Sequence, residues 1–388
     1  MSKILVLCKR MDMGGTEMAL LALLNKLLEN NHQVSLLLTD KSGLLLNRVP
    51  SEVKVLELDF HNDIYNKLAE KNIDNVPFHN VKKAIAKVIS LYYIKKGFFP
   101  ALYEYLLTKI VPLDENYDVV LDFHSYGYFL TAFAAKKIDA KKKAIWFHDE
   151  NVDWTNCTNV YFDCFDKMYC VSNSVKEALT NKYPSYSSKI EVLLNFIDTE
   201  SIKTKANASL NDPDFKGNLK LVTVGRLVQQ KGIDIAIKTA QILTHNSIDY
   251  QWYVIGDGED RQALQSQIDA LKLNDRFHLL GRKDNPYPYI ANCDIYIQPS
   301  RHEGYGISLI EARVLCKPII ASDISSSREQ ISAEKNGILA ALEPQKFAEQ
   351  IIRLINDQSL ADKLVSELKN EQIDFNSEYN KLDAFLKS

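Results

Sequence analysis

Short apolar runs alternate with helical patterns from the N-terminus onward. Residues 3–8 form an apolar run typical of a buried parallel strand, and leucines recur at helical spacing over residues 16–30. A second strand is predicted over residues 34–38, which completes a β-α-β unit. Similar apolar runs extend the series at 118–123, 144–147 and 167–171. The first half is therefore predicted to form an open parallel sheet with helices on its faces.

The second half repeats this architecture after a polar break. Residues 199–219 include Pro213 and Gly217 among polar residues, and we interpret them as an interdomain linker. Strands are then predicted at 220–224, 251–255, 276–280, 294–298 and 318–321. The sequence thus predicts an α/β protein with two Rossmann-like domains, residues 1–198 and 220–370. A C-terminal helix at 371–388 is a candidate for packing back on the first domain.

Composition places the chain among globular proteins of about two domains. Its 388 residues exceed one ordinary core, and 46% hydrophobic and 25% charged residues are usual proportions. The net charge of −3 argues against a nucleic-acid partner, which usually selects a basic surface. The six cysteines form no Cys-x-x-Cys pair, so a reducing cytoplasm is the simpler expectation. The N-terminal sequence lacks a signal-peptide layout, and no apolar run reaches membrane-spanning length.

Residues 81–107 differ from the rest of the chain because they mix lysines with Tyr, Phe and Ile. One interpretation is an amphipathic surface that touches a membrane or a lipid-linked acceptor. The other is a pair of helices packed on the sheet, with the lysines in solvent. Both interpretations stay open, so a position at the inner face of the cell membrane is considered beside a purely cytoplasmic one.

The segment from Gln298 to Glu311 has the most informative pattern. A strand ends near Gln298, a glycine-containing loop follows, and a helix is predicted to begin near Ile307, with Glu311 in its first turn. Ligands of open α/β sheets bind at such strand ends. Gly306 lets the backbone approach a ligand closely, and the free N–H groups of the helix start favour a phosphate. The carboxylates of Glu303 and Glu311 suit sugar hydroxyls, although acidic residues near a helix start also occur for electrostatic reasons alone.

Glu303 and Glu311 are separated by seven residues and are followed by Lys317-Pro318. This pattern resembles the E-x7-E motif of retaining GT-B glycosyltransferases, notably family four. The resemblance implies that Glu311 holds the donor ribose and that Glu303, a candidate catalytic residue, contacts the transferred sugar. It also implies the GT-B fold, in which two Rossmann-like domains with parallel sheets face each other across a cleft. Cys316 departs from the pattern, which usually has glycine there.

Arg226 and Lys231 lie in a second motif, between a predicted strand and the next helix. They are five positions apart across a turn that starts at Gly225 and ends at Gly232, so both can point into one crevice. A guanidinium and an ammonium suit a diphosphate and would stabilise it as a leaving group. The segment resembles the family's G-R-x4-K-G signature. The alternative is an exposed loop with two solvated cations.

Further candidates stand at other predicted strand ends. The resemblance implies that the Gly14-Gly15 loop closes over the donor phosphates through Gly15, and that Arg282 lies beside the base, although a surface arginine is equally compatible. His148 stands where the family often has a histidine near the reacting sugar, and a neutral imidazole there can hydrogen-bond a sugar hydroxyl or orient the acceptor. His124 is placed similarly and is a candidate acceptor-binding residue.

No metal or other cofactor is predicted. Only Asp212-Pro-Asp214 has the Asp-x-Asp spacing of many metal-dependent glycosyltransferases, and we interpret it as a turn in the predicted linker. Arg226, Lys231 and helix N-termini can supply the positive charge that a metal ion gives elsewhere.

The resemblance runs from residue 3 to residue 345. It implies a retaining, metal-independent hexosyltransferase that moves a hexose or N-acetylhexosamine from a nucleotide-sugar, with UDP favoured, to a glycan or lipid-linked acceptor. Capsule or lipopolysaccharide synthesis in bacteria is the expected context. A GT-B nucleotide-sugar epimerase and a non-catalytic accessory subunit are the alternatives. The retained charged residues favour an enzyme over the accessory subunit, and product analysis with and without acceptor would separate a transferase from an epimerase. The chain lacks the glycine fingerprint of a nicotinamide oxidoreductase, which argues against that class. The sequence specifies neither the sugar nor the acceptor.

Overall fold

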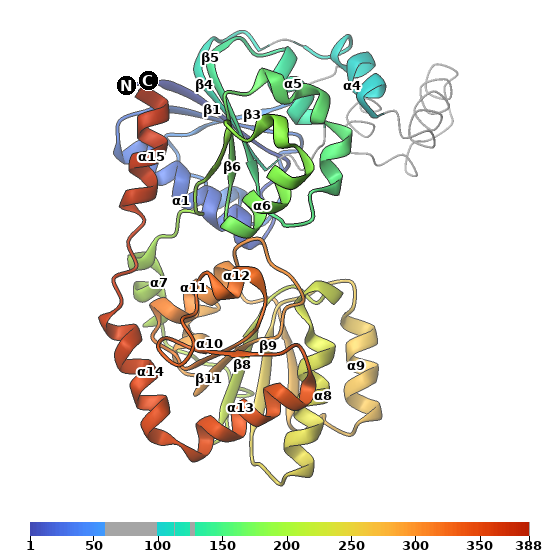
Figure 1. The fold of residues 1–388 in the computed structure, drawn as a ribbon, viewed down its shortest axis with the longest axis vertical. Coiled ribbons are helices and arrows are strands. Elements are labelled where there is room, and N and C mark those ends of the chain that lie inside the picture. The colour runs from blue at the N-terminus through green and yellow to red at the C-terminus, as the bar shows by residue number, and fades with distance from the viewer. Residues whose placement is uncertain (59–98, 112, 125–128, 388) are drawn as a thin grey trace. The chain divides into compact units, whose positions relative to one another are not determined.

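The structure, a computed structural model, describes residues 1–58, 99–111, 113–124 and 129–387. The chain forms two compact units: unit 1 combines Met1–Ile197 with Phe375–Ser388, and unit 2 is Asp198–Asp374. Each unit is a sheet of parallel strands with helices packed against it (Figure 1). This architecture confirms the predicted fold class, an α/β protein with two Rossmann-like units.

Unit 1 has a seven-stranded sheet in the order β3-β2-β1-β4-β5-β6-β7. Strand β1 pairs with both β2 and β4, so the strand order changes direction between β1 and β4. The strands are β1 (Lys3–Cys8), β2 (Gln33–Leu38), β3 (Lys54–Glu57), β4 (Tyr117–His124), β5 (Ala140–Phe147), β6 (Lys167–Cys170) and β7 (Ile190–Val192). The described α-helices are α1 (Gly15–Glu29), α4 (Phe99–Leu107), α5 (Phe129–Lys136), α6 (Asn173–Lys182) and α15 (Asn376–Lys387).

Two interpretations are open for residues 81–107. Of these, residues 81–98 lie outside the described residues. Its remainder is α4, which buries Leu102, Tyr103, Leu106 and Leu107 and packs against α5. None of the helices that the structure describes is both long enough and apolar enough to cross a membrane. The proposed membrane contact therefore stays a prediction.

Unit 2 has a six-stranded sheet in the order β10-β9-β8-β11-β12-β13, which changes direction between β8 and β11. The strands are β8 (Lys220–Val224), β9 (Gln251–Ile255), β10 (Phe277–Gly281), β11 (Ile295–Gln298), β12 (Ile319–Ser322) and β13 (Ile338–Ala340). The helices are α7 (Thr199–Ala206), α8 (Ile233–His245), α9 (Arg261–Ala270), α10 (Tyr287–Ala291), α11 (Ile307–Val314), α12 (Ser325–Arg328), α13 (Pro344–Asn356) and α14 (Gln358–Asn370).

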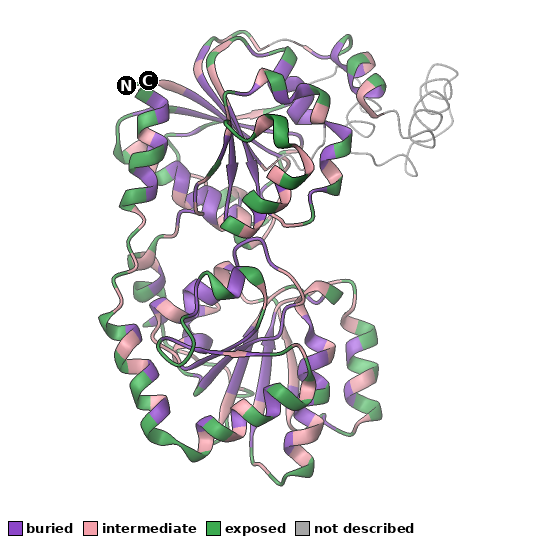
Figure 2. Cartoon of the chain, in the orientation of Figure 1, coloured by how far each residue is buried: buried purple, intermediate pink, exposed green. Residues whose placement is uncertain are grey.

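Burial explains why these segments adopt their structures. The central strands are apolar runs buried on both faces, as parallel strands covered by helices must be. Helix α13 instead buries Phe347, Ala348, Ile351 and Leu354, which recur on one face at helical spacing, and it packs against α8. Figure 2 shows this difference: the strands are largely buried, whereas the surrounding helices have one buried and one exposed face.

The stretch predicted as an interdomain linker, 199–219, differs from that expectation because it belongs to unit 2. It begins with α7, which the Asp198 side chain caps by accepting a hydrogen bond from the Ser201 N–H (2.8 Å). Only Ile202 and Ala206 of this helix are buried, so its apolar pattern is too sparse to be recognised in the sequence.

Helix α15, at the C-terminus, is tied to unit 1 by a buried carboxylate. Glu378 accepts a hydrogen bond from the Leu194 N–H (3.0 Å) and forms an ion pair with Lys381 (2.6 Å). The Glu378 side chain is only 8% exposed. Removing a buried acceptor leaves its donor without a partner, which costs more than the net energy of the bond itself.

We predict that Glu378→Ala lowers the stability of unit 1 by about 1–3 kcal/mol, because the partly buried Leu194 N–H is left without an acceptor. Glu378→Gln, which keeps an acceptor oxygen, should cost less. The matched control is Lys387→Ala, which removes the exposed Asp383–Lys387 pair of the same helix and should cost about 0.5 kcal/mol or less. Urea unfolding followed by circular dichroism measures all three, and equal losses for Glu378→Ala and Lys387→Ala would show that Glu378 does not anchor α15.

Candidate active site

Three charged residues of the sequence motifs lie at the carboxyl edge of the unit 2 sheet, where the strand order changes direction. The loop after β8 contains Arg226 and Lys231, and the loop after β11 contains Glu303. Strands β8 and β11 are hydrogen-bonded neighbours, so the two loops leave the same edge side by side. This reversal point is the usual ligand-binding position of an open α/β sheet.

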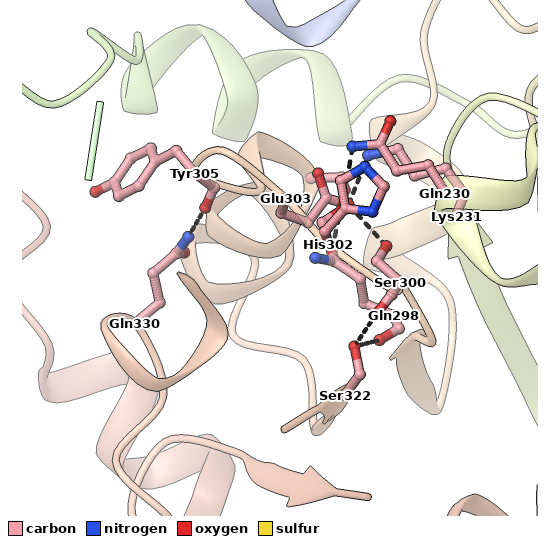
Figure 3. Close-up of polar contacts among 10 residues, drawn as sticks. Gln230, Lys231, Gln298, Ser300, His302, Glu303, Tyr305, Ser322 and Gln330 are labelled. Carbon is pink, nitrogen blue, oxygen red and sulfur yellow. Dashed lines mark hydrogen bonds and ion pairs between the residues drawn. The ribbon is translucent and has the colours of Figure 1, made fainter. Parts of the chain in front are cut away.

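Lys231 and Glu303 form an ion pair across the two loops. The Lys231 Nζ lies 2.6 Å from the Glu303 Oε1, and the Ser300 hydroxyl donates to the same oxygen at 2.7 Å (Figure 3). The two charged side chains are 18% and 7% exposed. Because little solvent reaches the two side chains, this charge-assisted contact is held in one geometry. The structure thus brings together one residue from each of the two sequence motifs.

Arg226 is exposed, and among the residues that the structure describes it has no ion-pair partner. Its loop is fixed by the backbone: Gly225 N–H donates to the Ile255 carbonyl (3.0 Å), and Leu227 N–H donates to the Asp257 carbonyl (3.1 Å). Gly256 has φ +146°, and a Cβ there would lie 1.9 Å from the Gly225 carbonyl oxygen, so only glycine fits. The guanidinium is therefore a solvent-facing cation on a fixed loop.

Arg282 lies two strands away from this loop, directly after β10, and its side chain is exposed. The Gly256 N–H donates to the Gly281 carbonyl (2.9 Å), which links the ends of β9 and β10. Arg282 is thus on the same edge of the sheet, and within the part of the chain that the structure describes no hydrogen bond or ion pair joins it to Lys231 or Glu303.

Helix α11 begins beside the ion pair. Its N-cap is Gly306, in the left-handed conformation (φ +74°), and Ile307 is its first residue. The first helical hydrogen bonds run from Leu309 and Ile310 to the Gly306 carbonyl (3.0 and 3.4 Å). The N–H of Ile307 precedes them and belongs to the set that a helix leaves for a ligand or water.

Glu311 lies in the second turn of α11. The prediction that it lies in the first turn is wrong by one residue. Its carboxyl is buried and accepts a hydrogen bond from the Tyr287 hydroxyl (3.1 Å). Burial raises the pKa of Glu311 to about 7, and the Tyr287 hydrogen bond opposes that rise. Tyr287, on α10, was not identified from the sequence, because only the fold brings α10 to α11.

Both motif glutamates lie near one buried phenol, that of Tyr296 on β11. Burial raises the pKa of Tyr296, and the nearby carboxylates of Glu311 and Glu303 raise it further. Glu303 lies in the loop that follows β11, and Glu311 lies on α11, the helix that this loop leads into. The seven-residue spacing therefore places both glutamates at the same end of β11.

Unit 1 also gathers polar side chains where its strand order changes direction. Gly14 is the N-cap of α1 and Gly15 is its exposed first residue. The Glu17 carboxylate folds back over Gly14, so that a Cβ on Gly14 would lie 2.4 Å from the Glu17 Oε2. The Glu17 Oε1 lies 3.4 Å from the Nδ1 of His124, at the end of β4. Glu17 and His124 thus form a carboxylate–imidazole pair across the β1–β4 reversal.

His148 follows β5 at the same edge and is buried. Its Nε2 lies 2.7 Å from the Phe123 carbonyl oxygen, so Nε2 carries the proton and donates it to that carbonyl. Burial lowers the pKa of His148 to about 4, and the Phe123 hydrogen bond opposes this. The imidazole is therefore neutral near pH 7, and its ring centroid is 5.8 Å from that of His124.

Asp212-Pro-Asp214 forms a turn within unit 2, as predicted. The Asp214 N–H donates to the Asp212 carboxylate (3.2 Å), which also accepts from Tyr289 (2.6 Å) and Lys283 (2.9 Å). Across the described ranges, no group of three or more His, Cys, Asp or Glu side chains is arranged to hold a metal ion.

Two Rossmann-like units, each with polar side chains at its reversal point, define a doubly wound protein of the nucleotide-binding type. Residues 13–201 match the family model for Glycosyltransferase Family 4, and residues 208–371 match that for Glycosyl transferases group 1. The chain therefore belongs to the GT-B glycosyltransferases of these families, as its two sequence motifs predict.

Individual relatives are distant. A glycosyltransferase of Methanocaldococcus jannaschii is 25% identical over 323 residues, which cover 80% of this chain and 84% of that protein. The poly(ribitol-phosphate) alpha-N-acetylglucosaminyltransferase of Staphylococcus aureus is 25% identical over 74% of this chain and 58% of its own length. Among solved structures, Anabaena HepE in complex with UDP and glucose has a TM-score of 0.72 at 19% identity, with both chains covered completely. The structural likeness supports the fold.

The raised pKa of Glu311 yields a prediction about stability. A carboxyl whose folded-state pKa lies above its unfolded value binds a proton on folding, so its contribution is complete below about pH 4.5 and is lost as the pH rises through about 7. Glu311→Gln cannot ionise and escapes this loss. We predict that the variant is within about 1 kcal/mol of the wild type near pH 5 and is more stable at pH 8.5, by up to about 3 kcal/mol.

Thermal melting of the unliganded proteins across this pH range tests the prediction. A stability difference that is the same at pH 5 and at pH 8.5 would mean that Glu311 ionises normally in the folded protein.

Proposed function

We propose that this glycosyltransferase is a retaining, metal-independent hexosyl- or N-acetylhexosaminyltransferase that uses a UDP-sugar. Its acceptor is proposed to be a glycan or lipid-linked glycan of a bacterial surface polysaccharide. The observation that carries the proposal is the Lys231–Glu303 pair at the reversal point of unit 2, next to the start of α11. An ammonium and a helix N-terminus suit the diphosphate, and the carboxylates suit the sugar and ribose.

In the proposed complex, the diphosphate contacts Arg226, Lys231 and the N–H groups at Gly306 and Ile307. The buried Glu311 is proposed to accept hydrogen bonds from the ribose hydroxyls, and as a carboxylate it can do so with both oxygens. Arg282 is proposed to lie beside the base. Arg226, Lys231 and the start of α11 all belong to unit 2. Unit 2 is therefore proposed as the donor-binding unit.

The proposed reaction breaks the bond between the anomeric carbon and the diphosphate oxygen, and the electron pair leaves with the diphosphate. The acceptor oxygen attacks from the same face, and its proton passes to the departing phosphate oxygen. Arg226 and Lys231 stabilise the charge that develops on the diphosphate, which is the role a metal ion has in other transferases. Glu303 is proposed to contact the sugar while positive charge develops at the anomeric carbon.

Unit 1 is proposed to bind the acceptor and to close over the donor phosphates through Gly15. A neutral His148 can accept a hydrogen bond from a sugar hydroxyl through Nδ1, because Nε2 is committed to the Phe123 carbonyl. His124, beside Glu17, is proposed as an acceptor contact. A position at the inner face of the cell membrane follows from a lipid-linked acceptor and is part of the proposal.

The names of several relatives agree with this assignment. They include a capsular polysaccharide biosynthesis glycosyltransferase of Staphylococcus aureus (26% identical, 55% of its length) and a lipopolysaccharide core glycosyltransferase of Rhizobium meliloti (24% identical, 58% of its length). A nucleotide-sugar epimerase or a non-catalytic accessory subunit is less favoured. An accessory subunit has no need for a lysine and a glutamate paired at this edge.

We predict that Lys231→Met weakens UDP binding by about tenfold or more, because it removes a charge-assisted contact to the diphosphate. The control is Lys238→Met, an exposed lysine of α8, which should bind UDP like the wild type. Isothermal titration calorimetry gives both affinities. Unchanged affinity in Lys231→Met would place the diphosphate elsewhere.

We also predict that a screen of UDP-, GDP- and ADP-sugars by thermal shift selects a UDP-sugar, which the enzyme hydrolyses slowly when no acceptor is present. Proton NMR of the first product should show the anomeric configuration of the donor. Turnover should persist in excess EDTA. A product with inverted configuration would contradict retention. If EDTA abolished turnover and added Mg²⁺ restored it, metal independence would be contradicted. Interconversion of sugars without transfer would indicate an epimerase.

A further inference from the structure

Asp234 and Arg301 join the two loops that contain Lys231 and Glu303. The Arg301 guanidinium forms a two-pronged ion pair with the Asp234 carboxylate, with nitrogen–oxygen distances of 2.7 and 2.8 Å. Asp234 is in the first turn of α8, three residues after Lys231, and Arg301 is two residues before Glu303. The pair therefore spans the same reversal point as the Lys231–Glu303 pair.

Backbone contacts reinforce this connection. The Arg301 guanidinium also donates to the Gln229 carbonyl (2.7 Å), and the Arg301 N–H donates to the Gln230 carbonyl (2.8 Å). The Gln230 side chain donates to the His302 carbonyl (3.1 Å), and Figure 3 shows Gln230 next to Lys231, facing the His302 loop. A Cβ on Gly232 would lie 1.9 Å from the Pro299 carbonyl oxygen, so the two backbones touch. These contacts lie on both sides of Lys231 in sequence and directly precede Glu303.

An ordinary surface ion pair contributes little, because water competes for both charges. The Asp234–Arg301 pair differs in its planar two-pronged geometry, in its half-buried side chains (31% and 30% exposed) and in the shared backbone carbonyl. Arg301 lowers the pKa of the Asp234 carboxyl, so the pair is charged throughout the neutral range. Such a pair fixes the separation of two loops.

We propose that Asp234 and Arg301 are positioning residues that set where the Lys231 ammonium stands. Neither touches the donor. By locking the β8–α8 loop to the β11–α11 loop, they hold Lys231 at a point from which it contacts Glu303 and the donor diphosphate at once. The inference rests on the proposed function, because it assumes that Lys231 binds the diphosphate.

A double-mutant cycle separates positioning from general stabilisation. Asp234→Asn keeps the size of the side chain and removes its charge. It should weaken UDP binding by about fivefold in the wild-type background, but by less than about twofold in the Lys231→Met background, because residues that act through one contact are not additive. A purely structural pair would weaken UDP binding equally in both backgrounds, and that result would overturn the proposal.

The protein supplies a matched control and a conservative variant. Asp323 and Arg328 form a similar two-pronged pair after β12 (2.6 and 3.0 Å), so Asp323→Asn should leave UDP affinity unchanged. Arg301→Lys keeps the charge without the fork, and should retain more UDP affinity than Arg301→Met. Equal affinities for those two variants would also count against positioning.

Calorimetry with UDP measures every variant, and circular dichroism confirms that each is folded. If Lys231→Met alone leaves UDP affinity unchanged, the proposed function fails. If Lys231→Met weakens binding but the Asp234→Asn effect is additive, only the positioning role fails.

Discussion

The ion pair between Lys231 and Glu303 is the interaction on which the account of this protein depends. Strands β8 and β11 are neighbours at the point where the strand order changes direction, so the loops that follow them leave the same edge of the sheet. Lys231 and Glu303 meet there. The Ser300 hydroxyl donates a hydrogen bond to the Glu303 carboxylate, and the Asp234–Arg301 pair links the two loops. The fold therefore determines the chemistry here by bringing two distant segments to one point.

The charges at this edge are largely balanced before any ligand arrives. Lys231 neutralises Glu303, and the pKa of Glu311 near 7 keeps much of that carboxyl protonated. Arg226 and Arg282 face solvent at this edge, and within the described residues neither has an ion-pair partner. A diphosphate adds negative charge next to the start of α11, so it can share Lys231 and attract Arg226. The burial that raises the pKa of Glu311 stabilises the neutral carboxyl at the expense of the charged one, and this cost is one that functional sites commonly carry.

Prediction from the sequence succeeded where burial is complete and failed where contacts are tertiary. Strands β1, β8 and β9 begin and end where their apolar runs do, because both faces are covered. The short strands β3, β7 and β13 have too few apolar positions to be recognised, and α7 buries only two residues. The motifs located Lys231 and Glu303, but not Tyr287 or the Asp234–Arg301 pair, whose members are joined only by the fold.

The most direct measurement is a crystal structure of the protein with UDP bound. The account predicts that phosphate oxygens lie within hydrogen-bond distance of the Lys231 Nζ and of the first N–H groups of α11, and that the ribose hydroxyls reach the Glu311 carboxylate. UDP bound away from the β8–β11 edge, with Lys231 still paired to Glu303 alone, would contradict it.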